Sequence, residues 1–246
     1  MKAIPNFRDL GGLDTLNGRK MRKGLIFRSG NFDRMSEKDV RNFFPPGFRV
    51  IIDLRTSKES AKTRRAVAGA KEINLPMEVE HTYRTMVRPN LYKKGVQGLI
   101  VGAVSSIYAG WLLSQKQIIG TLFEILRTQD SYPVLIHCRA GQDRTGFMCA
   151  LVHLALGADP AAIIRDYLLS NSYTMSRVRG IALFMKLVSL GFLCTANFVP
   201  AFTAHEQYLR SVFAAISNSF GGVERYLASC GISAGHLADF RDLVLE

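Results

Sequence analysis

Short apolar runs alternate along the chain with longer stretches in which apolar residues recur at the spacing of an α-helix. Four of these runs have the length and nearly continuous apolar character of buried β-strands, and they lie at residues 24–30, 49–56, 71–76 and 132–138. Strands that are apolar on both faces are typical of parallel sheets covered by helices. The alternation therefore predicts an α/β fold around a mostly parallel sheet.

The predicted helices begin at recognisable capping residues. They cover residues 37–44, 116–129, 160–171, 204–220, 223–230 and 234–246. Ser36 and Asp39 form a capping box for the first, and Asp159 with Pro160 provides the N-cap and first residue of the third. The last three helices make the C-terminal end helical. Since no linker or repeat interrupts the pattern, the chain is expected to be one domain, 1–246.

The helix over 204–220 has signals at both ends. Thr203 and Glu206 form a capping box at its start, and Gly221-Gly222 ends it.

Two long segments, 77–115 and 172–200, do not fit the strand and helix alternation. Connections of this length in a compact α/β domain are usually lids or binding elements. An ordinary helical pair packed on the core is the alternative, and it is slightly favoured for 172–200. The apolar stretch 98–113 within the first segment favours a helical lid insertion at about 77–115, which could close over a site or rest on a membrane.

The net charge of +12 is unevenly distributed. Residues 203–246 contain five acidic and three basic residues, a balance of −2, which leaves +14 on residues 1–202. Basic residues gather at 18–24, 55–65 and 83–94. Such a field attracts phosphorylated substrates, an acidic membrane surface or nucleic acid, and the alternative for each cluster is a solvated surface that aids solubility.

The four cysteines are scattered without the paired spacing of a zinc site or of a disulfide scaffold, so free thiols are expected. No apolar core of a signal peptide stands at the N-terminus, and the apolar stretch 181–194 is short and contains Lys186. These features predict a cytoplasmic protein or one secreted without a cleavable signal peptide. They leave the oligomeric state open.

One cysteine lies where a reactive thiol is expected. Cys138 ends the strand over 132–138, a glycine-containing loop follows, and a helix is predicted to start at about Thr145. The positive end of that helix and the nearby Arg144 both stabilise a thiolate. The loop residues Arg139, Ala140, Gly141, Gln142 and Asp143 can direct successive N–H groups at a tetrahedral oxyanion, and Arg144 offers a planar fork to two phosphate oxygens.

These parts predict a phosphatase that uses Cys138 as nucleophile and Arg144 as phosphate ligand, through a cysteinyl-phosphate intermediate and with neither metal nor other cofactor. Thr145 is expected to hydrogen-bond the thiolate, and His137 to brace the loop. A general acid must protonate the leaving oxygen. Asp143, inside the loop, is favoured over Asp53, which stands at the end of a strand but can equally form an ion pair with Arg55.

The string from His137 to Gly146, HCRAGQDRTG, resembles the loop of the cysteine-dependent protein tyrosine phosphatase superfamily, in particular the bacterial tyrosine and lipid phosphatases with HCxAGKDRTG. Segments 6–12, 24–39, 50–59, 166–171 and 221–233 are also similar to that branch. The resemblance implies a sheet of four or five strands, a lid, and activity on phosphotyrosine, phosphoserine or phosphothreonine, or phosphoinositides. Lysine in the lipid-active members is Gln142 here, and Arg139 is a candidate to restore its charge.

Three other classes share part of this pattern. A rhodanese-type sulfurtransferase also carries a loop cysteine before a helix, but the Thr-Gly after Arg144 argues against it. A non-catalytic phosphate reader would use the same loop without turnover. A nucleic-acid binder is not expected, because no binding motif or series of stacking aromatics accompanies the charge.

Overall fold

The computed structural model describes residues 4–15, 18–33, 35–36, 38–39, 47–62, 67, 69–78 and 83–246. The helix predicted over 37–44 lies largely outside this range. Of its expected start, the Ser36 hydroxyl accepts from the Asp39 N–H at 3.1 Å, as a capping box requires.

The five strands form one sheet in the order β1-β2-β5-β3-β4. Their bounds are β1 Arg8–Asp9, β2 Ile26–Ser29, β3 Val50–Asp53, β4 Lys71–Asn74 and β5 Val134–His137. The last four are parallel, and β1 pairs with β2 in antiparallel direction. The predicted mostly parallel α/β fold is confirmed. The edge strand β1 was not predicted, because its two polar residues form no apolar run.

The register brings the ends of three strands together. His137, at the end of β5, pairs with Ser29 of β2 on one side and with Asp53 of β3 on the other. Since parallel strands end at the same edge of a sheet, the segments that follow these residues meet there. That edge receives the loop that starts at Cys138.

The helices that flank the sheet follow the predicted order, except that the short helix after β3 was not predicted. They are α2 Ser57–Lys62, α5 Lys116–Leu126, α6 Asp143–Ala155, α7 Pro160–Leu168, α10 Glu206–Ala215 with the π-turn η4 Ile216–Phe220, α11 Val223–Ser229 and α12 Ala234–Val244; a 3₁₀ turn, η3 Gln129–Ser131, precedes β5. Helix α6 is buried on nearly every side and is the centre of the apolar core. It begins at Asp143, two residues before the predicted start.

One predicted cap is wrong. The N-cap of α10 is His205, whose ring accepts from the Gln207 N–H, so the helix starts two residues later than expected. Thr203 does not cap it; this residue instead follows the end of the preceding helix, and its hydroxyl donates to the Val199 carbonyl there. The predicted end is confirmed, since Gly221 adopts the left-handed conformation (φ 71°) that closes a helix.

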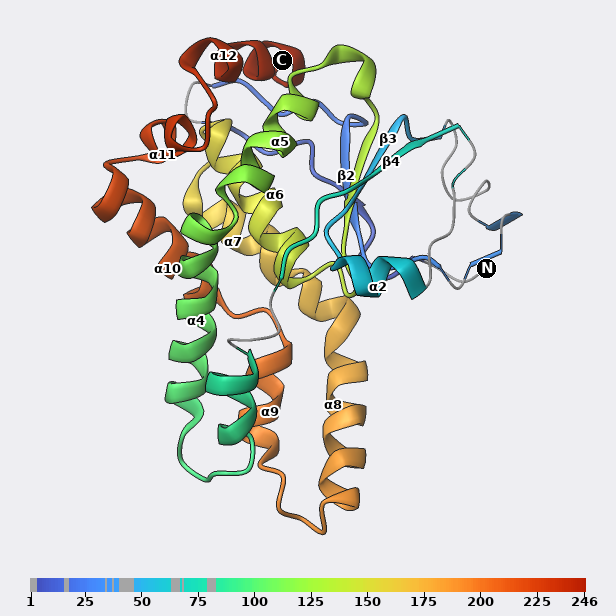
Figure 1. The fold of residues 1–246 in the computed structure, drawn as a ribbon, viewed down its shortest axis with the longest axis vertical. Coiled ribbons are helices and arrows are strands. Elements are labelled where there is room, and N and C mark those ends of the chain that lie inside the picture. The colour runs from blue at the N-terminus through green and yellow to red at the C-terminus, as the bar shows by residue number, and fades with distance from the viewer. Residues whose placement is uncertain are drawn as a thin grey trace.

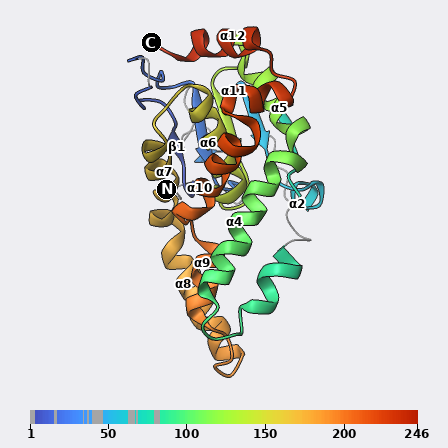
Figure 2. The ribbon, with the colours of Figure 1, turned by 90° about the vertical axis from the view of Figure 1, so that its left-hand side faces the viewer.

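Three helices extend past the edge of the sheet where β5 ends, as Figure 1 shows. They are α4 Gln97–Ser114, α8 Ser170–Val188 and α9 Thr195–Phe202, preceded by the short turns η1 Tyr83–Val87 and η2 Arg88–Asn90. Helix α9 packs against both α4 and α8, and Figure 2 shows the group projecting from the body in the perpendicular view. We call residues 83–114 and 170–202 the helical arm.

Helix α4 contains the whole apolar stretch 98–113 that predicted a lid. Its Tyr108 and Trp111 are buried in the main core, so the C-terminal half of the helix is anchored there. Closure of 77–115 over a site stays a prediction. Among the described residues, α4 is also the one helix long and apolar enough to cross a membrane, a test that core helices of this kind pass as well.

Candidate active site

The cysteine-bearing loop connects β5 directly to α6. Cys138 follows the last residue of β5, residues 138–142 form the loop, and Asp143 opens the helix. The side chain of Cys138 is almost fully enclosed, and Arg144 lies one residue into α6. The structure therefore brings the two predicted catalytic residues to one loop at the N-terminal end of a helix, where an anion is favoured.

A glycine lets the loop approach the sheet. Gly141 has φ 68°, a conformation that disfavours residues with a side chain, and a Cβ at this position would lie 2.5 Å from the backbone of Ser29. Glycine is therefore required both for the turn and for the contact with β2.

Carbonyl groups of the loop accept hydrogen bonds from other parts of the protein, whereas its backbone N–H groups have no acceptor among the described residues. The Arg139 carbonyl accepts from the Asn31 N–H at 3.0 Å. The Gly141 carbonyl accepts from Asn6 Nδ2 at 2.6 Å and from Arg28 Nη2 at 2.8 Å. Within the described part of the chain, no backbone N–H of residues 139–142 has a protein acceptor. These four donors remain available for an anion, as the sequence predicted for a phosphate-binding loop.

A network of buried charges supports the loop from the side of the sheet. Arg8 Nε lies 2.7 Å from Asp166 Oδ1, and Arg28 Nη1 lies 3.0 Å from Asp166 Oδ2. Arg8 also donates to Asn6, whose amide holds Gly141. Burial by itself would raise the pKa of Asp166, but Arg28 and Arg8 lower it below its ordinary value. We call Asn6, Arg8, Arg28 and Asp166 the loop-support network.

Arg144 is oriented by a carboxylate that the sequence interpretation did not assign. Its Nη1 donates to Glu59 Oε2 at 2.6 Å and its Nη2 to Glu59 Oε1 at 3.2 Å. Burial opposes the charge of Arg144, yet Cys138 and Glu59 raise its pKa above the ordinary value, so the guanidinium is always charged. Glu59 itself is placed by a capping box with Thr56 at the start of α2. That capping box was readable in the sequence, but its link to Arg144 was not.

Asp143 has two donors on one oxygen. Tyr108 Oη donates to Asp143 Oδ1 at 2.7 Å, and Gln142 Nε2 donates to the same oxygen at 3.2 Å. The hydroxyls of Tyr108 and Tyr167 lie 2.9 Å apart, and since Tyr108 gives its proton to Asp143, Tyr167 must donate to Tyr108. Burial and the Asp143 charge raise the pKa of Tyr108 well above its ordinary value, which keeps it a donor. Asp143 Oδ2 has no hydrogen-bond partner among the described residues.

Asp53, the alternative acid, lies in a buried ion pair. Arg55 Nε and Nη2 donate to its two oxygens at 2.9 and 2.8 Å, and Ser60 donates to Oδ2 at 2.9 Å. Burial would raise the pKa of Asp53, but the hydrogen bonds and the charge of Arg55 lower it below the ordinary value. An ionised, fully paired carboxylate has no proton to give. The geometry therefore favours the ion-pair interpretation of Asp53.

Two further predicted residues, His137 and Thr145, are both buried. His137 is fully buried, with Nε2 3.9 Å from Asp53 Oδ1 and its ring against Phe32, which fits a bracing role. Burial lowers the pKa of His137, so the ring is neutral. Thr145 is also buried, but its hydroxyl has no hydrogen-bond partner among the described atoms, so the expected bond to Cys138 is not present.

Gln142 and Arg139 differ sharply in exposure. The Gln142 side chain is buried, accepts from Thr174 Oγ1 of α8 at 2.9 Å and donates to the Phe202 carbonyl of α9 at 3.2 Å. It therefore connects the loop to the helical arm. Arg139 and Ala140 are exposed on the loop.

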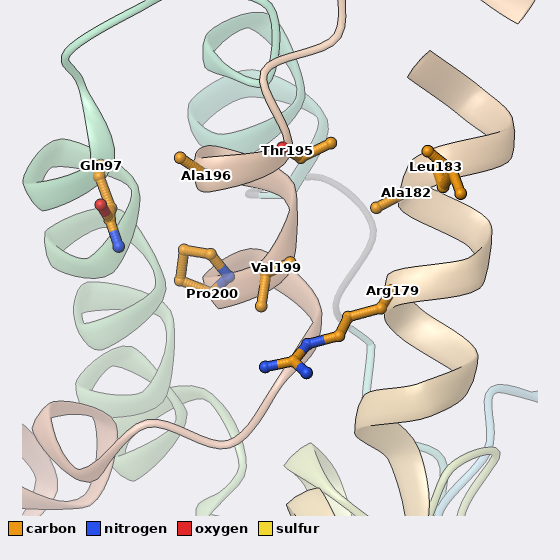
Figure 3. A pocket seen from close by; sticks show the side chains of 8 residues that line it. All are labelled: Gln97, Arg179, Ala182, Leu183, Thr195, Ala196, Val199 and Pro200. Carbon is orange, nitrogen blue, oxygen red and sulfur yellow. The ribbon is translucent and has the colours of Figure 1, made fainter. Parts of the chain in front are cut away.

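A groove of about 430 Å³ on the arm is separate from this site. Figure 3 shows its lining from three helices, α4, α8 and α9: Gln97, Arg179, Ala182, Leu183, Thr195, Ala196, Val199 and Pro200. It contains none of the loop residues. Among the described residues, no group of three or more His, Cys, Asp or Glu side chains could hold a metal ion.

Named relatives align with 84% to 98% of this chain. A Cupriavidus necator protein named "Putative tyrosine-protein phosphatase" is 28% identical over 234 residues, which are 92% of this chain and 81% of that protein. The Mycobacterium tuberculosis "Triple specificity protein phosphatase PtpB" is 26% identical over 98% of this chain and 96% of its own. A tyrosine-protein phosphatase of Nostoc commune is 24% identical over 84% of this chain and 69% of that protein.

Solved structures with some similarity include the core catalytic domain of the PP-IP phosphatase SIW14 from S. cerevisiae. It is 16% identical, with a TM-score of 0.39, and the match covers 69% of this chain and 78% of that one. The sequence profile described as "Tyrosine phosphatase family" matches residues 1–246, the entire length. With the cysteine loop, its unused N–H groups and the anchored arginine in place, this full-length match is decisive: the chain belongs to the tyrosine phosphatase family.

Proposed function

We propose that this phosphatase hydrolyses phosphomonoesters through a phosphocysteine formed on Cys138. One observation carries the proposal. The loop that follows the Cys138 thiol provides four unused backbone N–H groups, and the guanidinium of Arg144, anchored by Glu59, comes directly after this loop. Together they provide donors for the three non-bridging oxygens of a phosphoryl group, and these oxygens carry most of the charge in a loose transition state. The steps below need no metal ion, because these donors fulfil its electrostatic role.

In the first step the Cys138 thiolate attacks phosphorus, the S–P bond forms, and the bond between phosphorus and the ester oxygen breaks. Asp143 gives its proton to the departing oxygen. In the second step a water oxygen attacks phosphorus, the S–P bond breaks, and the water proton passes to Asp143. The products are the alcohol or phenol and inorganic phosphate, and the thiolate and the protonated Asp143 are restored.

In the proposed mechanism the acidic proton of Asp143 lies on one particular oxygen. Tyr108 and Gln142 both donate to Oδ1, so Oδ1 must remain an acceptor and Oδ2 carries the proton. The two hydrogen bonds also fix the carboxyl plane. Tyr108 is therefore a positioning residue, which acts through Asp143.

Phosphotyrosine is the proposed principal substrate. The rings of Tyr83 and Phe202 meet edge to face at 5.6 Å, and the Phe202 carbonyl is held by Gln142 of the loop. An aromatic pair beside the loop can stack a phenol ring, whereas a serine side chain gains nothing from it. Phosphoserine, phosphothreonine and phosphoinositides are proposed as weaker substrates, partly because one relative is named as a triple-specificity phosphatase.

Gln142 bears on the lipid substrates. Its side chain is a neutral amide, so it lacks the positive charge that a lysine would offer to an inositol phosphate. Its hydrogen bonds to Thr174, Asp143 and Phe202 also keep it buried. Arg139 is the exposed cation on the loop and is the residue proposed to contact a second phosphate. An Arg139→Gln variant is expected to lose activity on phosphoinositides and to keep it on phosphotyrosine.

The test is phosphate release in EDTA from a phosphotyrosine peptide, a phosphoserine peptide and short-chain phosphoinositides, each beside Cys138→Ser. Acid quenching during turnover should trap a phosphocysteine at residue 138. Equal turnover by the Cys138→Ser variant, or tight phosphate binding with no release of product, contradicts the proposal. The second result would identify a phosphate-binding protein without catalysis.

A further inference from the structure

The far end of the helical arm exposes a concentration of large apolar side chains. Six of them lie between 62% and 87% exposed, and they are Leu183, Phe184, Leu187, Val188, Leu190 and Phe192. They come from the last turns of α8 and the turn into α9, at the lower end of Figures 1 and 2. Water-exposed apolar patches of this kind usually mark an interaction surface.

The backbone at this end is also unusual. Leu190 has φ 52°, in the left-handed region where glycine and asparagine are favoured, and it is the most exposed large apolar residue described. A leucine held there has a conformational cost and gains no burial in return. Such a combination is expected where the side chain serves a contact outside the chain.

A second loop lies at the same end. The Leu91 carbonyl accepts from the Cys194 N–H at 3.1 Å, and Asn197 of α9 donates to the Lys93 carbonyl. These bonds hold residues 90–94 against the start of α9. We call residues 91–94 and 183–192 the arm tip, which adds exposed Tyr92, Lys93 and Lys94 to the apolar cluster, beside Lys186.

The charge of the arm indicates what the tip contacts. Residues 83–114 contain four basic residues and residues 170–202 contain three, and neither segment contains an Asp or a Glu, so the arm carries a formal charge of +7. Lysine around exposed Leu, Phe and Tyr is the composition of surfaces that enter the headgroup region of anionic membranes. Three of these lysines, Lys93, Lys94 and Lys186, lie at the tip itself.

We propose that the arm tip docks onto an anionic lipid bilayer, with Leu187, Leu190 and Phe192 entering the acyl boundary and the three lysines meeting acidic headgroups. Association with a second copy of the chain is less favoured, because two tips with several lysines each and no carboxylate would repel one another. The amphipathic groove beside the tip, in which the Arg179 side chain lies across apolar walls, fits the same environment (Figure 3).

The tip is distant from the chemistry. Thr174 contacts Gln142 of the catalytic loop, and Val188 lies fourteen residues further along α8, which corresponds to about 21 Å of helix. Substitutions at the tip should therefore leave the hydrolysis of a small soluble substrate unchanged. This separation lets membrane binding be tested whether or not the proposed phosphatase mechanism holds.

The experiment is flotation of the full chain with phosphatidylcholine vesicles, with and without phosphatidylserine. The wild type should bind the anionic vesicles and bind neutral ones much more weakly. Leu187→Glu should weaken anionic binding by about tenfold or more, since it removes one apolar contact and adds repulsion. The matched control is Leu113→Glu, another strongly exposed leucine on the arm, at the opposite end of α4, which should bind as the wild type does.

The charge is tested separately. Replacing Lys93, Lys94 and Lys186 by glutamine should weaken anionic binding by roughly 100-fold, since each lysine near such a surface contributes about fivefold. Equal binding by the tip and control variants contradicts the proposal, as does equal binding to neutral and anionic vesicles. Absence of vesicle binding together with a dimer in light scattering that Leu187→Glu abolishes also overturns it, in favour of self-association. Circular dichroism of each variant checks that folding is intact.

Discussion

The loop-support network and the arm tip depart from the usual distribution of polar and apolar residues in opposite directions. The network buries Arg28 completely and pairs it with Asp166 beneath the catalytic loop, whereas the tip leaves Leu190 and Phe192 in water. Buried charges are tolerated only when they are paired, and exposed apolar clusters are retained only where something covers them. Both departures therefore mark function: rigidity is needed under the loop, and contact is proposed at the tip.

The two regions should respond very differently to substitution. Removing one member of a buried ion pair leaves its partner charged and unsolvated, which is among the most destabilising changes known. Replacing an exposed leucine removes little packing, because the side chain contacts mostly water. Catalysis and stability should therefore fail on the loop side, and membrane binding alone should fail at the tip.

The largest effect is expected at the nucleophile. Cys138→Ser should lower kcat for p-nitrophenyl phosphate by about 10⁴-fold or more, because a hydroxyl is not ionised at neutral pH. Binding of a phosphate-mimicking anion, measured by calorimetry, should persist through Arg144 and the N–H groups. The tip variant Leu187→Glu is the contrast and should retain kcat.

Asp143→Asn should come next. Loss of the proton donor is expected to slow a phosphotyrosine or alkyl phosphate substrate by about 10²- to 10⁴-fold and a substrate with a good leaving group far less. The check is the dependence of the rate on the pKa of the leaving group, which should become steep. Equal losses for all leaving groups would shift the acid role away from Asp143.

Asp166→Ala should lower the free energy of unfolding by about 3–5 kcal/mol, because Arg8 and the fully buried Arg28 lose their partner. Leu187→Ser at the tip should change it by no more than about 0.5 kcal/mol. Urea denaturation of the two variants beside the wild type measures both. A similar cost at the two positions would remove the contrast between the regions.

Acid should destabilise the body of the protein through its buried titratable groups. Burial lowers the pKa values of His137 and His153 below 6.5, the ordinary value for an unfolded chain. Between the lowered pKa and 6.5 the unfolded chain therefore binds protons that the native protein does not bind, so stability is lost as the pH falls through this range. Asp53 and Asp166 have pKa values below 3.8, so their contribution is present above that value and is lost as pH falls through the native pKa. Both effects predict that Tm falls steadily from about pH 7 downward. Thermal unfolding followed by circular dichroism across this pH range measures the effect.

The smallest effect concerns the positioning of Asp143 by the arm. Tyr108→Phe removes one hydrogen bond to Oδ1 and should cost about 1 kcal/mol, or roughly fivefold in kcat for a poor leaving group. Because this hydrogen bond orients the carboxyl that protonates the leaving oxygen, the loss should be smaller for p-nitrophenyl phosphate, whose leaving group hardly needs an acid. A purely structural role for Tyr108 would lower stability and slow both substrates equally.

Local patterns were sufficient for the four parallel strands, for the starts of helices α5, α7, α11 and α12, and for the catalytic loop, but not for β1 or α2. Four apolar runs, the Asp159 cap and the string around Cys138 each place their information within about ten adjacent residues, where backbone geometry and capping act directly. The start of α10 was misplaced, because Thr203 ends the preceding helix α9, where its hydroxyl donates to the Val199 carbonyl. Local signals could not show that α9 would extend to this residue.

The sequence by itself determined the fold class, the identity of the loop and the pairing of Cys138 with Arg144, since all of these follow from short-range order. Only the tertiary structure decided which distant groups serve that loop: Glu59 on Arg144, Tyr108 on Asp143, and Asp166 beneath Gly141. It also decided which apolar side chains remain in water at the arm tip. Contacts between residues far apart in sequence depend on how whole elements pack, and no local spacing encodes that packing.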